Sequence, residues 1–178
     1  LCHQINDLGL SHCSMYELTI DPDTPFGKMN LQMPTNEEMA EMYETIANTL
    51  ALPRYEVSNY SVPGNECRHN QNIWDGAPYI GIGRGAAGRV YVENTWYEQM
   101  GDGARYEPMD DRTRATEKII MGMRTIRGVK LTPDVLAIIK PDFISTHPEL
   151  IHSHNDARIY ATEKGMLILD DLLVNLIR

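Results

Sequence analysis

Residues 66–88 contain two groups whose types and spacing could do chemistry. Cys67 and His69, with one residue between them, offer a thiolate and an imidazole, which are ligands for transition metals and for haem iron. Trp74 adds an aromatic surface that could stack on a macrocycle. Residues 81–88 read GIGRGAAG, a run of small residues where the main chain can approach a bound molecule closely. This stretch is therefore the predicted functional centre.

The cysteine and the histidine also have an ordinary structural interpretation. On predicted loop backbone, Cys67 could be a small buried apolar residue and His69 could donate to a carbonyl. A tetrahedral zinc site would need two further ligands. Three other histidines could supply them only if the C-terminal part of the chain folded back: His147, His152 and His154.

The glycine run and an upstream histidine are equally open to a structural reading. Residues 81–88 resemble a nucleotide-binding turn, but neither a helical pattern nor a suitably placed acidic residue follows. Close main-chain packing at a sheet corner explains the glycines as well. His12 begins a predicted strand near Tyr16 and Glu17, so we interpret it as a packing or strand-capping residue.

Composition narrows the class of protein. The chain has 178 residues and a net charge of −9, which argues against a nucleic-acid partner because phosphates require a basic surface. Its three scattered cysteines favour a reducing cytoplasm over a disulfide framework. No apolar run approaches the roughly 20 residues of a membrane span. The chain begins at Leu1 within a helical pattern, so we expect it to be a piece of a longer protein.

The N-terminal half predicts an α/β arrangement. Apolar spacing indicates a helix over residues 1–8 and a strand over 11–20, which together favour a parallel sheet. Thr35 and Glu38 form a capping box that begins a helix ending before Pro53. Further strands are predicted at 55–60 and 89–94, the second as one arm of a hairpin, followed by a loop at 96–106.

The segment after residue 107 predicts a small helical module of winged-helix type. We expect helices over 110–127, from Thr132 and over 142–153, then a strand over 157–163. A strongly apolar helix follows from Gly165. Acidic flanks favour a packing lid over a DNA-reading role.

Several motifs in order resemble the HemW-like branch of the oxygen-independent coproporphyrinogen III oxidase family of radical SAM proteins. The matching stretches are HCSMYELTI at 12–20, YEVSNY at 55–60, CRHN at 67–70, YIGIGRGAAG at 79–88, GMR at 122–124 and TEKG at 162–165. The chain departs from the family pattern at Asp21, Asp23, Ile73 and Ala87. Ile73 and Ala87 replace a Tyr and a His that could have touched a tetrapyrrole or the cofactor.

This resemblance implies a fold and a division of the chain. Residues 1–106 would be the last αβ units of a partial radical SAM (β/α) barrel, and residues 107–178 the winged-helix-like C-terminal module. The family holds a [4Fe–4S] cluster with a C-x-x-x-C-x-x-C run, which Cys2, Cys13 and Cys67 do not form. The chain would therefore be the C-terminal portion, without the cluster-binding half.

The resemblance also implies site residues. His69 would be the haem-ligand candidate, with Cys67 beside it, and S-adenosylmethionine would lie near Tyr16, Glu17, Ala86 and Ala87. No catalytic residue is expected in this chain. The cluster and S-adenosylmethionine belong to the full-length parent.

The predicted function is haem binding and delivery to an accepting protein, as part of a radical SAM haem chaperone. One alternative is oxidative decarboxylation of coproporphyrinogen III by the same superfamily, and another is a nucleotide-binding module with no redox role. A partial barrel would leave the 11–20 strand with an exposed edge, so we also expect self-association.

Overall fold

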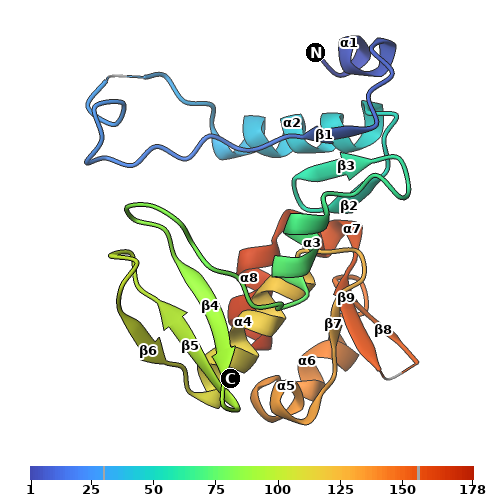
Figure 1. The fold of residues 1–178 in the computed structure, drawn as a ribbon. Helices are drawn as coiled ribbons and strands as arrows, with labels where there is room; N and C mark the ends of the chain where they lie inside the picture. The colour runs from blue at the N-terminus through green and yellow to red at the C-terminus, as the bar shows by residue number, and fades with distance from the viewer. Residues whose placement is uncertain (30, 156) are drawn as a thin grey trace. The chain divides into compact units, whose positions relative to one another are not determined.

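The computed structural model describes residues 1–29, 31–155 and 157–178, which form two compact units, residues 1–66 and 67–178 (Figure 1). The predicted division at residue 106 separates barrel from C-terminal module, and it stays a prediction. Within the described residues the sheets are small and antiparallel, and no closed barrel forms. No helix of the described residues is both long and apolar enough to cross a membrane.

The first unit has two helices and one sheet. Helix α1 (Cys2–Asp7) ends before Gly9, whose φ of 61° is accessible to glycine at little cost. Helix α2 (Asn36–Thr49) begins with the predicted capping box, in which Glu38 N donates to Thr35 Oγ1 at 3.2 Å and Thr35 N to Glu38 Oε2 at 2.8 Å. The sheet has the order β1-β3-β2, from β1 (His12–Ser14), β3 (Asn59–Ser61) and β2 (Arg54–Glu56).

Two strand predictions and the sheet direction are wrong in this unit. The predicted strand at 11–20 is regular only over β1, and the predicted strand at 55–60 is a hairpin of β2 and β3. Ser58 N donates to Glu56 Oε2 at 2.9 Å and tightens the turn between them. The chain therefore reverses at once, and β3 lies antiparallel to both β2 and β1 instead of forming a parallel sheet.

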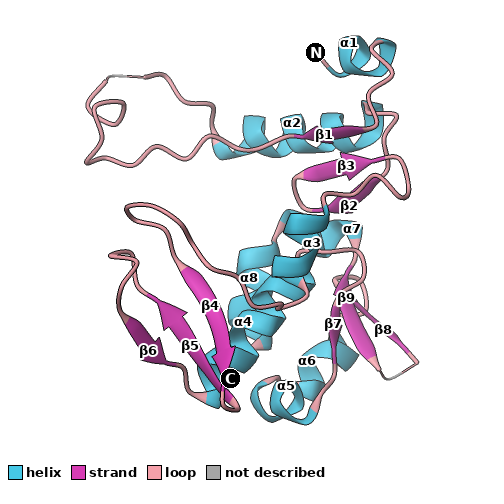
Figure 2. Ribbon diagram, in the orientation of Figure 1, coloured by secondary structure: helices cyan, strands magenta, loops and turns pink. Residues whose placement is uncertain are grey.

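The second unit begins with helix α3 (Arg68–Trp74) and a separate sheet, which Figure 2 shows in magenta. The predicted hairpin is present: β4 (Gly88–Val92) pairs with β5 (Thr95–Gln99) through a turn at Glu93 and Asn94, both with positive φ. Strand β6 (Tyr106–Pro108) completes the sheet. The loop predicted at 96–106 is wrong at both ends, because the turn at residues 101–103 lets β6 pair with β5.

The rest of the second unit packs around helix α4 (Asp111–Met123), whose N-cap Asp110 accepts from Thr113 N at 2.8 Å. The elements that follow are β7 (Val129–Lys130), α5 (Pro133–Ile138), α6 (Pro141–Thr146), β8 (Ile151–His154), β9 (Arg158–Ala161), α7 (Glu163–Leu167) and α8 (Leu169–Leu176). The helix predicted at 142–153 is thus α6 and then β8. The third sheet has the order β7-β9-β8, and buried side chains from these elements form the core, among them Ile119, Met123, Val135, Ile159, Leu172 and Leu176.

Candidate functional site

Residues 68–74 form helix α3, so the prediction of loop backbone around the cysteine and the histidine is wrong. Cys67 is the N-cap in extended conformation, and its carbonyl accepts from Gln71 N at 3.0 Å. The helix ends at Asp75 because Gly76 follows with a φ of 78°. His69 is consequently held on a helix, with its position fixed by main-chain hydrogen bonds.

The imidazole of His69 is exposed and available. Within the described part of the chain its side chain has no hydrogen bond or ion pair, and Ile73 lies one helical turn further on the same face. No three His, Cys, Asp or Glu side chains among the described residues come close enough to hold a metal ion. His147 does not join His69: its Nδ1 lies 3.0 Å from Phe143 O, and its ring stacks on Phe143. A zinc site at Cys67 and His69 is therefore not assembled by these residues.

The glycine run is a loop held by one buried side chain. Gly81 N donates to Gln99 Oε1 at 2.8 Å, and Gln99 Nε2 donates to Gly81 O at 3.1 Å and to Gly103 O at 3.3 Å. Gln99 is only 2 % exposed and pairs with Gly88 across β4 and β5. A Cβ at Gly88 would lie 2.4 Å from Gln99 Oε1 and 2.8 Å from the main-chain oxygen of Tyr79, so glycine is required there for space.

The tip of this loop presents main chain to solvent. Gly83 and Gly85 have φ values of 105° and 78°, and a Cβ at either would meet nothing within 4 Å. These two glycines therefore serve the backbone conformation and leave open space around it. Ala87 is exposed and Ala86 half-buried. The next element is strand β4 and not a helix, which counts against the dinucleotide-binding alternative.

An arginine pair fastens the hairpin to α4. Arg89 Nη2 lies 2.6 Å from Glu117 Oε1, and its Nη1 lies 3.2 Å from Glu98 Oε1. The hydrogen bond to the Glu117 carboxylate raises the pKa of Arg89. Arg114 completes the link: its guanidinium lies 3.7 Å from the Trp96 ring centroid, and its Nη2 donates to Gly76 O. The end of α3 and the hairpin are thus both attached to one helix.

Tyr16 and Glu17 belong to the first unit. Both are exposed and lie after β1 in irregular extended chain, with Tyr16 69 % exposed. Their predicted contact with S-adenosylmethionine stays a prediction. His12 Nε2 lies 2.8 Å from Tyr55 Oη, in agreement with the packing interpretation.

The YEVSNY motif contains a chain of hydrogen bonds between buried polar side chains that was not predicted from the sequence. Glu56 is fully buried, and its Oε2 accepts from Asn59 Nδ2 at 2.6 Å. Asn59 Oδ1 in turn accepts from Ser14 Oγ at 2.7 Å. Because a carboxylate only accepts, it fixes the orientation of the Asn59 amide and makes Ser14 the donor. The sequence signal for this buried carboxylate was the position of Glu56, two residues after Arg54, in a strand with few other charges.

The chain is similar in sequence to several known proteins that share one name. The chain is 31 % identical over 145 residues to the heme chaperone HemW of Synechocystis sp., covering 68 % of this chain and 34 % of that protein. It is 30 % identical over 185 residues to the heme chaperone HemW of Lactococcus lactis, covering 89 % and 48 % respectively. The corresponding Escherichia coli protein is 38 % identical over 90 residues, covering 49 % and 24 %.

The chain belongs to the HemW-like family. It spans from about a quarter to about half the length of these three HemW proteins. No family model matches the chain, and no solved structure matches it significantly.

Proposed function

We propose that this chain is the C-terminal portion of a haem chaperone that binds haem and delivers it to an accepting protein. The name shared by its relatives, heme chaperone HemW, supports the proposal. The structural observation that carries it is the imidazole of His69, which is exposed, held on α3 and without a partner among the described residues. Haem is the cargo of the proposed chaperone.

His69 would bind the haem iron through a neutral imidazole nitrogen. Ile73, on the same face of α3, would contact the macrocycle, where the family pattern has a Tyr. Cys67 is the second candidate ligand, and it lies half-buried at the N-cap of α3. A single ligand from the protein would suit a protein that must release its cargo.

After β6, the chain has the order helix, strand, helix, helix, strand, strand, helix, helix, with the sheet order β7-β9-β8, which supports the winged-helix-like assignment of residues 107–178. Residues 1–106 would be the end of a radical SAM barrel. Tyr16, Glu17, Ala86 and Ala87 would border S-adenosylmethionine.

The residues of this chain do not fit a [4Fe–4S] cluster. Cys2, Cys13 and Cys67 form no C-x-x-x-C-x-x-C run, and no metal-binding cluster occurs among the described residues.

Titration with ferric haem tests the role of His69. The wild-type chain is expected to give the Soret band of imidazole-ligated haem, and His69→Ala to lower the affinity at least tenfold, about 1.4 kcal/mol. His3→Ala is the matched control, because His3 is also exposed on a short helix. An unchanged Soret band and affinity in His69→Ala would remove His69 from the proposal.

A further inference from the structure

We propose that a small hollow between the end of α3 and helix α4 holds one propionate carboxylate of the haem that His69 ligates. This inference rests on the proposed function and names a second contact of the same site. The hollow has a volume of about 30 Å³. Since one water-sized group needs about 10–15 Å³, the space fits a group the size of a carboxylate and is far too small for the macrocycle itself.

The hollow begins one helical turn from His69. Ile73 lines it and lies four residues after His69 on the same face of α3, about 6 Å further along the helix axis. Gly76, which follows the end of this helix, also lines the hollow. A macrocycle whose iron binds His69 and whose edge lies over Ile73 can therefore turn a propionate arm into this space.

The charge of the lining favours an anion. Three cationic side chains and one carboxylate line the hollow: Arg89, Arg114, Lys118 and Glu117. Arg114 is only 7 % exposed, and the side chains of Arg89 and Glu117 are also mostly buried, so water screens these charges little. The chain as a whole has a net charge of −9 and repels the two carboxylates of haem, so anionic haem needs a local positive site.

The protein leaves hydrogen-bond donors unused at this lining. Lys118 Nζ donates to Asp134 Oδ2 at 2.6 Å, and its other two N–H groups have no partner among the described residues. Arg114 Nε is buried and also lacks a partner in the described part of the chain. Glu98 and Asp134 pair with Arg89 and Lys118 but do not line the hollow. These two carboxylates reduce the net positive charge without filling the space, so a propionate can still accept from Lys118.

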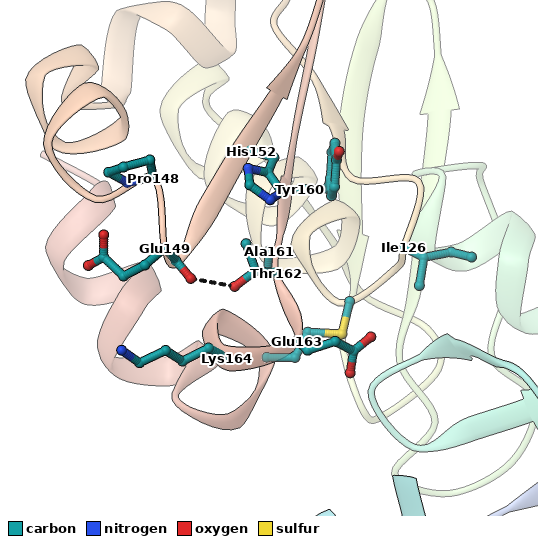
Figure 3. Close-up of a pocket in the computed structure, with 10 residues that line it drawn as sticks. Ile126, Pro148, Glu149, His152, Tyr160, Ala161, Thr162, Glu163 and Lys164 are labelled. Atoms are coloured by element: carbon teal, nitrogen blue, oxygen red, sulfur yellow. Dashed lines mark hydrogen bonds between the residues drawn. The ribbon is translucent and has the colours of Figure 1, made fainter. Parts of the chain in front are cut away.

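A larger hollow in the same unit has the opposite charge balance. It lies between the β7-β9-β8 sheet and α7, has a volume of about 560 Å³ and is drawn in Figure 3. His152 and Tyr160 form one wall, with ring centroids 5.7 Å apart. One lysine and two carboxylates also line it: Lys164, Glu149 and Glu163. Lys164 therefore provides a matched control, because it is a lysine beside a hollow that does not favour an anion.

Haem and haem dimethyl ester separate the propionate contact from iron ligation, because esterification removes both carboxylate charges and leaves the iron and the ring unchanged. The full chain is titrated with each ferric compound in the same detergent solution, and it is expected to bind haem roughly fivefold more tightly than the ester. Lys118→Met should abolish most of this preference, whereas Lys164→Met should retain it. The ratio is measured within one variant, so a loss of folding, which weakens binding of both compounds, does not imitate the result.

Asp134→Asn provides a test by gain of affinity. Removal of the Asp134 carboxylate releases Lys118 for the propionate, so affinity for haem is expected to rise about twofold or more. Affinity for the dimethyl ester should stay as in the wild-type chain. Unfolding of the variant cannot produce this rise, and an unchanged affinity for haem would contradict the role of Lys118.

The outcomes distinguish this contact from the proposed function. Equal affinity of the wild-type chain for haem and for the dimethyl ester overturns the propionate contact and leaves the proposed function intact. The same holds if Lys118→Met and Lys164→Met give the same ratio of affinities. Absence of haem binding by the wild-type chain overturns the proposed function and this contact together.

Discussion

The side-chain amide of Gln99 forms hydrogen bonds with both the N–H and the C=O of Gly81, at 2.8 and 3.1 Å, as the main chain of a neighbouring strand would. The same amide reaches Gly103 O at 3.3 Å, so one buried residue joins two turns. Gly85 N adds a main-chain hydrogen bond to Gly101 O at 2.8 Å. The glycine loop therefore has a defined shape although its tip is open to solvent.

Replacing Gln99 is expected to release this loop. Gln99→Ala leaves the Gly81 N–H without a partner, at a cost of about 1–3 kcal/mol. Gln99→Glu keeps the acceptor but places a carboxylate against the carbonyls of Gly81 and Gly103. The loss of loop stability in this variant should be large at pH 7 and smaller below about pH 4, where the carboxyl is protonated. Amide hydrogen exchange of Gly81 measures the effect. Gln71→Ala is the control, and exchange as slow as in the wild-type chain in both Gln99 variants would contradict the assignment.

Several helices of this chain could be predicted because the signals that begin them are local. The capping box of Thr35 and Glu38 and the Thr132-Pro133 start both act within one turn, and both are present as predicted. The sheets depend on pairing between distant segments, which no local pattern states. The sequence therefore predicted one continuous strand where the chain reverses at Val57 and Ser58, and it predicted a loop where β5 lies.

The candidate site was predicted in part for the same reason. His69 and the glycine run were identifiable from residue type, but the helix around His69 was not, since its seven residues carry no side-chain cap. Gln99 lies eleven residues after Gly88, and only the β4–β5 register makes it the partner of the loop. His152 and Tyr160 likewise become one surface only through the pairing of β8 and β9.

Gly122 in α4 should not tolerate alanine. Alanine normally stabilises a helix interior by up to about 1 kcal/mol over glycine. A Cβ at Gly122 would instead lie 2.8 Å from Val129 Cβ and 3.0 Å from Val129 Cα, and main chain cannot move aside cheaply. Gly122→Ala is therefore expected to lower the free energy of unfolding by about 1–3 kcal/mol. Urea denaturation with Thr116→Ala as a control on the same helix measures it, and a stabilised Gly122→Ala chain would refute the close approach.

Arg114 is expected to resist replacement by lysine. Its planar guanidinium stacks on Trp96 at 3.7 Å and also reaches Glu117 Oε2 at 3.2 Å and Gly76 O, a combination that an ammonium group cannot reproduce. Arg114→Lys should destabilise the second unit by about 1–3 kcal/mol and shift the indole N–H resonance of Trp96. Arg127→Lys is the matched control, because its ion pair with Asp75 at 2.9 Å is half-exposed. Equal destabilisation by the two substitutions would show that Arg114 does not link α4 to the hairpin and to the end of α3.

The ion pair of Asp134 and Lys118 should make stability depend on acid. Burial acts to raise the pKa of Asp134, but the hydrogen bond from Lys118 Nζ, at 2.6 Å, and the positive charge of that group outweigh burial and lower the pKa to about 2. A lowered folded-state pKa stabilises the protein above the unfolded value of about 4, and the contribution is lost as pH falls toward 2. Both side chains are about one-third exposed, so solvent screening limits the pair to about 0.5–1 kcal/mol.

A double-mutant cycle with Asp134→Asn and Lys118→Met measures this coupling by urea denaturation. The coupling energy should be constant from pH 7 to about pH 5 and shrink between about pH 4 and pH 2, as the carboxylate takes up its proton. Asn at position 134 cannot titrate, so stability of the Asp134→Asn chain should fall less steeply in that range than stability of the wild-type chain. A coupling energy that stays the same at pH 7 and pH 3 would show that the carboxylate charge does not hold this contact between α4 and the start of α5.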